Sequence, residues 1–153
     1  MAITADVRIQ SEPFDTGAEI ASLSSGRRDN GALVTFSGIC RDEAGTLAAL
    51  EIEHYPGMAE AEISRIAAEA AERWPVTAIT VIHRHGRIVT GDPIVLVMTV
   101  SEHRQAAFAA AEFMMDFLKS RAPFWKKEHR VDGSSGEWVD AKETDEKALT
   151  RWE

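Results

Sequence analysis

The sequence contains a single cysteine and no segment of the kind that directs a chain to a membrane. Cys40 alone cannot form an intramolecular disulfide, and it supplies no cluster of thiols for a structural zinc site. The first residues show no basic-then-apolar signal, and no apolar run approaches the roughly 18 residues that a membrane helix needs. We therefore expect a cytoplasmic protein that does not bind a membrane.

An excess of positive charge is also lacking. The chain has 17 Lys and Arg against 25 Asp and Glu, which gives a formal net charge of -8. A surface this acidic does not attract nucleic acid or anionic lipid through bulk charge, so we expect no nucleic-acid ligand. The hydrophobic content of 44% excludes global disorder, and 153 residues predict one domain over residues 1–153.

Hydrophobic periodicity predicts strands that alternate with helices. Strands are expected at 3–9, 32–40, 47–55, 77–86, 93–101 and 124–130, with a short extended piece at 137–141. Helices are expected at 16–23, 63–74 and 104–121, and Thr144 is a candidate cap for a last helical turn.

Three local patterns make this prediction more specific. Thr16 and Glu19 have the spacing of a capping box that opens the first helix. The strands 32–40 and 47–55 are predicted to form a hairpin, and 93–101, which is apolar on both faces, is predicted to be a central strand. The fold class is then α+β, with a mostly antiparallel sheet packed with helices.

One segment is unusually basic for such an acidic chain. Residues 119–130, KSRAPFWKKEHR, hold five of the 17 cations and a single acid, Glu128. These cations either form a local anion site or complement the C-terminus of the long helix and pair with the acidic tail. Composition alone leaves both interpretations open.

Two further features have a functional and an ordinary interpretation. His83 and His85 share one strand face and could bind a metal, but without a third ligand a half-buried strand with locally bonded histidines is preferred. Cys40 could carry a persulfide, yet on an apolar strand a cysteine is more often inert packing.

The predicted helix 104–121 separates two cations. Arg104, Phe108, Ala111, Met115 and Lys119 fall in one narrow stripe, which is expected to be buried against something. The two cations are 15 residues apart, or roughly 22 Å at 1.5 Å per residue, too far for both to hold one small ligand. If Arg104 and Lys119 serve the same site, two chains must build it.

Several segments, in this order and spacing, closely resemble the family of molybdopterin synthase large (catalytic) subunits, from about Gly31 to Trp152. They are FSGICRD, EIEHYPGMAE, VIHRHGRIVTGDPIV, SEHRQAAF, FMMDFLKSRAPFWKKE and WVDAKETDE. The resemblance implies an α/β hammerhead fold with a small antiparallel subdomain. It also implies a homodimer of large subunits within a heterotetramer, with a small ubiquitin-like sulfur-carrier subunit at each distal end.

The resemblance further implies a reaction and its residues. Cyclic pyranopterin monophosphate receives two sulfur atoms from the C-terminal Gly-Gly thiocarboxylate of the small subunit, and no metal or other cofactor is required because the sulfur arrives activated. Lys119 and Lys126 are the implied catalytic residues, with Lys119 as acid/base, nucleophile or fixed charge. The implied substrate-binding residues are Arg41, His103, Arg104, Met115, Lys127 and Glu128.

Some points lie outside this resemblance. Ile39 stands where some relatives carry a lysine, so one cation of the anion pocket is absent. The side-chain-free Gly-Gly tail is expected to thread a channel beside Phe124 and Trp125. Two rival functions remain: a non-catalytic α+β module that binds a phosphorylated metabolite, and a sulfurtransferase that uses a persulfide on Cys40.

Overall fold

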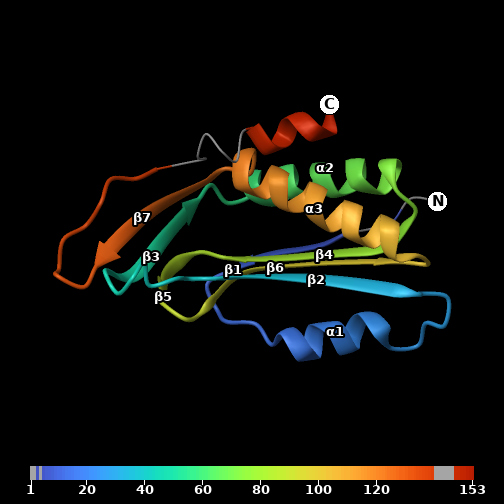
Figure 1. The fold of residues 1–153 in the computed structure, drawn as a ribbon, viewed down its shortest axis with the longest axis horizontal. Coiled ribbons are helices and arrows are strands. Elements are labelled where there is room, and N and C mark those ends of the chain that lie inside the picture. Colours follow the sequence, from blue (N-terminus) through green and yellow to red (C-terminus); the bar gives the residue numbers. More distant parts are fainter. Residues whose placement is uncertain (1–2, 4, 140–146) are drawn as a thin grey trace.

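The computed structural model describes residues 3, 5–139 and 147–153. Figure 1 shows the order of the elements along the chain. They are β1 (Asp6–Gln10), α1 (Thr16–Ser24), β2 (Ala32–Ile39), β3 (Leu47–His54), α2 (Met58–Arg73), β4 (Val76–Arg84), β5 (Gly86–Val89), β6 (Pro93–Ser101), α3 (Arg104–Ser120), β7 (Phe124–Arg130) and a short 3-10 helix, η1 (Leu149–Trp152). The expected extended piece lies outside the described residues beyond position 139, as does the expected cap at Thr144.

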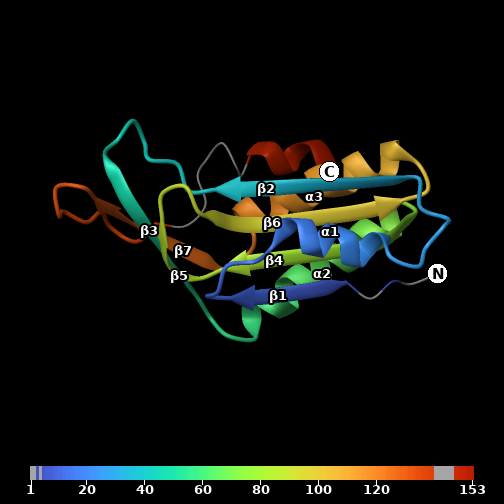
Figure 2. The same cartoon turned by 90° about the horizontal axis from the view of Figure 1, so that it is seen from below.

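The strands form two sheets. The larger has the order β1-β4-β6-β2, and only its β1–β4 pair is parallel. The smaller has the order β5-β3-β7 and is antiparallel. It extends from one end of the larger sheet (Figures 1 and 2). This confirms the predicted α+β class with a small antiparallel subdomain, and β6 is central as expected.

The predicted hairpin of β2 and β3 is wrong. β2 pairs with β6, opposing Phe36 to Val97, whereas β3 pairs with β7, opposing Glu51 to Lys127. Between the two strands the chain turns through Glu43 and Ala44, both at positive φ, and passes from one sheet to the other. A short alternating run identifies a strand, but it does not say which other strand it will bond.

A strand that the sequence interpretation missed completes the small sheet. β4 ends at Arg84, and the chain bends at Gly86, whose φ of 85° is readily adopted only by glycine. From this glycine the chain continues as β5 (Gly86–Val89) and pairs with β3. The run expected to be one strand over 77–86 therefore contributes to both sheets.

The helices cover both faces of the larger sheet. α2 and α3 lie on one face and α1 on the other (Figure 1). The predicted stripe of α2 is buried at Ile63, Ile66 and Ala70, and α3 contributes Phe113 and Met114 to the same core. Under α1 a smaller cluster forms from Ile82, Leu96 and Met98, with Phe14, Ile20 and Leu23 packed against it.

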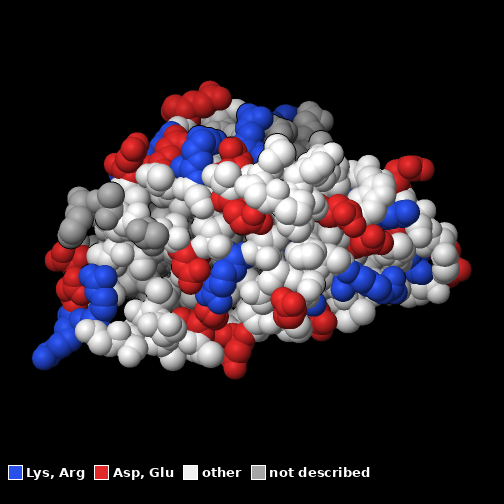
Figure 3. All heavy atoms as spheres, turned by 180° about the vertical axis from the view of Figure 1, so that it is seen from behind, with Lys and Arg blue, Asp and Glu red and all other residues white. Residues whose placement is uncertain are grey.

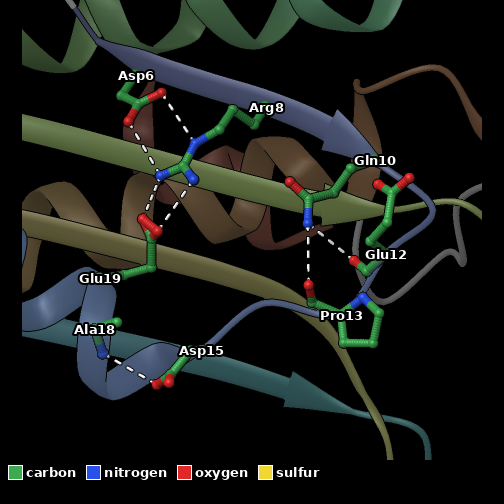
Figure 4. Close-up of polar contacts among 8 residues, drawn as sticks. All are labelled: Asp6, Arg8, Gln10, Glu12, Pro13, Asp15, Ala18 and Glu19. Atoms are coloured by element: carbon green, nitrogen blue, oxygen red, sulfur yellow. Dashed lines mark hydrogen bonds and ion pairs between the residues drawn. The ribbon is translucent and has the colours of Figure 1, made fainter.

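The first helix starts differently from the prediction. Asp15, not Thr16, is the N-cap, and its carboxylate accepts a hydrogen bond of 3.1 Å from the backbone N–H of Ala18. Glu19 does not close a capping box; it accepts a bond of 3.0 Å from Arg8 of β1, which also contacts Asp6 (Figure 4). This ion pair ties α1 to the edge strand of the sheet.

The C-terminal residues pack onto the helical layer. The Trp152 indole N–H donates to Asp116 at 2.6 Å, and its ring lies edge-on to Trp74 and Phe113. Among the described residues, none of the helices combines the length and apolarity needed to cross a membrane.

Candidate functional site

The topology places the predicted site residues at two ends of one helix. β6 runs to Ser101, and α3 begins at Arg104 and continues without a break to Ser120, packed back along the sheet. Arg104 and Lys119 therefore lie at opposite ends of α3, as expected from their spacing (Figure 1). The C-terminal end of α3 leads directly into β7, so Lys119 and Lys126 belong to the same end.

A buried histidine lies behind the two lysines. The His83 ring is only 6% exposed and stacks on the Phe124 ring, with centroids 3.9 Å apart and planes inclined by 13°. Its Nδ1 lies 2.8 Å from the backbone carbonyl oxygen of Arg84. A carbonyl oxygen only accepts, so Nδ1 carries the proton.

The two predicted catalytic lysines act on this same ring. Burial lowers the pKa of His83 to about 3; the bond to Arg84 opposes this, and the positive charges of Lys126 and Lys119 lower the pKa further. Phe124 and Lys126 are two residues apart in β7 and so share one strand face. Lys119 from α3 and Lys126 from β7 thus both place positive charge near enough to His83 to lower its pKa.

Two other histidines extend this cluster. The His54 ring lies 4.6 Å from that of His85 and 6.2 Å from that of Phe124. Burial lowers the pKa of His54, and His85 lowers it further, while Glu60 at 3.9 Å opposes both. Within the described part of the chain, no group of three or more His, Cys, Asp or Glu side chains is arranged to hold a metal ion.

The remaining basic residue of this strand has a structural role. Arg84 is 6% exposed and donates to the backbone carbonyls of Ser11 and Pro93, which joins the segment after β1 to the start of β6. The strand 76–84 is thus more deeply buried than the half-buried strand that was expected.

The N-terminal end of α3 is open. His103 and Arg104 are exposed and line a pocket of about 440 Å³ with Gly31, Glu102 and Gln105. His103 is the N-cap but makes no side-chain capping bond, and the first turn holds no acidic residue. The first backbone N–H groups of the helix and the two basic side chains make this end favourable for an anion.

The other predicted substrate-binding residues are distributed around the C-terminal end. Arg41 is exposed in the turn after β2 and pairs with Glu43 at 3.1 Å. Met115 and Glu128 are half-buried, and Glu128 shares the β7 face of Lys126. Lys127 points to the opposite face, where its ammonium lies 5.6 Å from the Trp138 ring.

A second cleft, which sequence reasoning anticipated only in part, lies on that opposite face of β7. It has a volume of about 330 Å³ and is lined by Glu53, His54, Tyr55, Trp125 and Trp138. Tyr55 and Trp125 meet edge to face at 5.4 Å. The expected channel beside Phe124 and Trp125 corresponds to this cleft only through Trp125, because Phe124 is buried against His83.

Two expectations about burial were wrong for the isolated chain. Lys119, at the end of the stripe expected to be buried, is exposed. Phe108, in the stripe expected to be buried, is 62% exposed. Both lie on α3, so the surface that would cover them is not supplied by the described part of this chain.

Cys40 behaves as packing. It is 2% exposed, burial raises the pKa of its thiol, and its Sγ lies 3.7 Å from the Ile88 carbonyl oxygen. A thiol that is buried and held protonated is a poor sulfur carrier. These observations favour the ordinary interpretation over the persulfide hypothesis.

The surface charge is divided into separate groups. On the face shown in Figure 3, Lys and Arg occur in several places, each interrupted by acidic or uncharged residues. On this face, positive charge is therefore not gathered into one patch, in keeping with the net charge of -8.

Comparison with known proteins gives consistent results. The family model described as "MoaE protein" matches residues 9–121. The molybdopterin synthase catalytic subunit of Mesorhizobium japonicum is 70% identical over 95% of this chain and 92% of its own length. Among solved structures, the molybdopterin biosynthesis MoaE protein from Burkholderia ambifaria superposes with a TM-score of 0.83 at 51% identity, covering 97% of each chain. Molybdopterin synthase from Staphylococcus aureus has a TM-score of 0.77 at 32% identity, covering 91% of this chain and 98% of its own.

Proposed function

This chain belongs to the MoaE protein family, and from that premise we propose that it is the catalytic subunit of a molybdopterin synthase, acting in molybdenum cofactor biosynthesis. The specific step is sulfur transfer from the C-terminal thiocarboxylate of a small ubiquitin-like subunit to cyclic pyranopterin monophosphate. Two such transfers form the dithiolene of molybdopterin.

The positive charge that Lys119 and Lys126 both exert on His83 is the observation that carries this proposal. The two lysines come from the last turn of α3 and from β7, and both lower the pKa of the buried His83. A site with two lysine side chains suits an anionic substrate, because each ammonium group attracts negative charge. The thiocarboxylate of the carrier tail and the phosphate of the pterin are both anions of the required kind.

The two lysines are proposed to act at the chemical step. In each transfer a carbon–sulfur bond to the pterin forms while a carbon–oxygen bond at the same pterin carbon breaks, and that oxygen leaves with a proton or remains on the phosphate. The bond between sulfur and the tail's carbonyl carbon breaks, and water supplies the oxygen that returns the tail as a carboxylate. Negative charge develops on the carbonyl oxygen in the tetrahedral intermediate, and a nearby ammonium group stabilises it. We assign this role to Lys126. To Lys119, whose side chain is exposed, we assign an interaction with the reacting sulfur atom.

Substrate binding is proposed to use the other end of α3. His103, Arg104 and the free N–H groups of the first turn suit the phosphate, with Arg104 able to form a two-pronged contact. Because Lys119 lies at the far end of the same helix, one site combines His103 and Arg104 of one copy with Lys119 and Lys126 of another. A homodimer of this chain meets that need, and the exposed Phe108 between the two ends supports it.

The carrier tail is proposed to approach along β7. Trp125 lines the cleft on one face of the strand, and Met115, Lys126 and Glu128 lie near the reacting end, with Arg41 adding charge. A Gly-Gly tail has no side chains, so a narrow passage can hold it through its backbone.

Reconstitution tests this function directly. The protein is mixed with thiocarboxylated small subunit and cyclic pyranopterin monophosphate, and molybdopterin is assayed as product. We expect product only when all three are present. Binding of the phosphorylated pterin without product, while a relative's catalytic subunit works in the same assay, would replace this proposal by the non-catalytic binding module.

A further inference from the structure

The backbone beneath the pocket at the start of α3 is held by contacts that the proposed reaction does not explain. β6 ends at Ser101 and His103 is the N-cap of α3, so the chain turns back within residues 101–103. This turn lies at the end of the larger sheet away from the small sheet (Figure 1). The course of its backbone decides where His103 and Arg104 are placed.

Ser101 holds this turn from inside the protein. It is 1% exposed, and its hydroxyl oxygen lies 2.9 Å from the Pro75 carbonyl oxygen and 3.3 Å from the backbone nitrogen of His103. A hydroxyl has one proton and a carbonyl oxygen only accepts, so Ser101 donates to Pro75 and accepts from the His103 N–H. The N-cap of α3 is thereby tied to the segment that follows α2.

Gly31 lies against the same turn. Its backbone N–H donates to the Ser101 carbonyl at 3.0 Å, and a Cβ atom on Gly31 would lie 2.1 Å from the Glu102 carbonyl oxygen. Only glycine allows two stretches of backbone to come this close, because any side chain would push the Glu102 carbonyl away. The preceding residue, Asn30, is itself held, since its Oδ1 accepts a hydrogen bond of 2.8 Å from the Thr77 hydroxyl.

The pocket depends on where this backbone lies. Glu102 Oε1 is 3.5 Å from His103 Nε2, so a negative charge offsets part of the positive charge that lines the pocket. The N–H groups of the first turn of α3 have no side-chain cap, and they attract an anion that lies along the N–H bonds. They serve a phosphate only if the helix begins at the right place and in the right direction.

We propose that Ser101 and Gly31 are positioning residues, which hold residues 101–103 so that Arg104 and the N–H groups of the first turn are in place before the phosphate arrives. This inference rests on the proposed function, since it takes the phosphate of the pterin as the ligand of this pocket. A preformed pocket loses less conformational freedom on binding than one that the anion must order, so the benefit is in affinity. Ser101 is buried and acts through His103.

Removal of the Ser101 hydroxyl is the first test. Ser101→Ala takes away the partner of the His103 N–H, and KM for the pterin is expected to rise about three- to tenfold, the scale of one hydrogen bond. At saturating substrate kcat is expected to stay within about twofold of wild type, because the groups that act in the transition state are unchanged.

Thr99→Val is the matched control. Thr99 lies on the same strand, is 0% exposed, and its hydroxyl donates to the Ala107 carbonyl of α3 at 2.6 Å, one turn away from the pocket. This variant also loses a buried hydroxyl but is expected to keep the wild-type KM. A KM in Ser101→Ala within about twofold of wild type, or one equalled by Thr99→Val, would overturn the inference.

Gly31→Ala is the second test and is expected to have the larger effect. The added methyl group meets a backbone oxygen, which cannot move without shifting the start of α3, so KM should rise about tenfold or more. Gly17→Ala is the control, because a Cβ atom there meets its nearest neighbour, Asp15 Oδ1, at 3.4 Å, an ordinary contact. A wild-type KM in Gly31→Ala would show that the close approach does not position the pocket.

A titration with inorganic phosphate tests the pocket without turnover. In NMR spectra of the wild-type protein, phosphate is expected to shift the backbone N–H signals of Arg104, Gln105 and Ala106, whereas chloride at equal ionic strength is not. In Ser101→Ala, the phosphate concentration at half of the shift should rise about three- to tenfold, and Gly31→Ala gives the same measurement if Ser101→Ala does not fold.

The outcomes of this titration are separate from those of the activity assay. No shift of the first-turn signals in wild type, or an unchanged midpoint in the variants, would overturn the inference. If the wild-type protein forms no product but the titration gives the expected result, the proposed function fails while the positioning of the pocket by Ser101 and Gly31 stands.

Discussion

The two ends of α3 carry positive charge in very different surroundings. At the C-terminal end, Lys119 is exposed and Lys126 is half-buried, and both charges act on a buried His83 that is stacked on Phe124. At the N-terminal end, His103 and Arg104 are exposed around an open pocket of about 440 Å³. The C-terminal end lies against packed side chains, whereas the N-terminal end is an exposed surface to which a second molecule can bind.

This difference between the two ends of α3 fits two different tasks, taking part in the reaction and binding the substrate. A group that acts in a transition state gains from being held rigidly, because reorganisation during the reaction is costly. A group that binds a phosphate can be exposed until the ligand and the neighbouring subunit arrive. Under the proposed function, the single chain contains the reacting half of a site and, roughly 22 Å away along α3, the binding half of another.

Loss of a lysine from the reacting half has the largest expected effect. Lys119→Ala should lower turnover by at least about 10²-fold, the scale of a group used in the transition state, and Lys126→Ala nearly as much. Molybdopterin formation under saturating substrates is the measurement. Lys147→Ala, in the C-terminal segment, is the matched control and should leave turnover unchanged; wild-type turnover in Lys119→Ala would remove the assignment.

Complementation between two inactive variants tests whether the halves come from different chains. In a hybrid dimer of Arg104→Ala and Lys119→Ala, one site collects both lesions and the other collects neither. Random reassortment of equal amounts makes half of the dimers hybrids, so about a quarter of the sites should recover.

The experiment is to co-refold the two variants, verify hybrid formation with two affinity tags, and assay product. Each variant refolded alone provides the baseline. If verified hybrids remain as inactive as their parents, Arg104 and Lys119 of different chains do not build one site. The difference between the two ends of α3 would then not reflect a site shared by two chains.

Acid stability should distinguish the packed end from the open one. The folded-state pKa of His83 is about 3, below its ordinary value of 6.5, because of burial and the charges of Lys126 and Lys119. Between these values the unfolded chain binds the extra proton, so the free energy of unfolding falls as pH decreases from about 6.5 toward 3.

We expect His83→Phe to make the free energy of unfolding less dependent on pH, when urea denaturation is compared at pH 7 and pH 4. His103→Ala, at the exposed end, is the control and should retain the wild-type dependence. An unchanged dependence in His83→Phe would mean that the ring is not kept neutral by its surroundings.

Cys40→Ser should have the smallest effect on catalysis. The thiol is buried in the core and lies 3.7 Å from the Ile88 carbonyl oxygen, so its replacement changes packing but no reacting group. Near-normal turnover is expected in the molybdopterin assay. Abolished activity in a variant that folds normally would support the persulfide mechanism instead.

Much of the local structure was predictable. The stripe of α2 correctly indicated that helix, because it reflects which side of the element is buried. The existence of α3, β6 and β7 was also predicted, but the stripe of α3 that holds Phe108 is not the face that the chain buries. The cap of α1 was misplaced by one residue, since Asp15 and Thr16 are both good caps and only the contact of Glu19 with Arg8 decides between them. The hairpin prediction failed at Arg41 to Thr46, where adjacency in sequence suggested a pairing that the structure does not make.

The candidate site likewise has a part that the sequence predicted and a part that only the structure showed. Its basic residues were visible as a cluster at 119–130 in an acidic chain, and their separation from Arg104 followed from the length of one unbroken helix. His83 was noticed only as part of a possible metal pair. No pattern in the sequence relates residue 83 to residue 124, because the contact depends on two strands of different sheets meeting at their ends.

By itself, then, the sequence determined most of the elements, the family and the distance between the two ends of α3, because these depend on short-range periodicity, on ordered segments and on the constant rise of a helix. Only the tertiary structure decided that β3 pairs with β7 and that β4 brings His83 against Phe124. Backbone hydrogen bonding is the same for every strand, so the partner is selected by packing across the whole core rather than by neighbours in the chain.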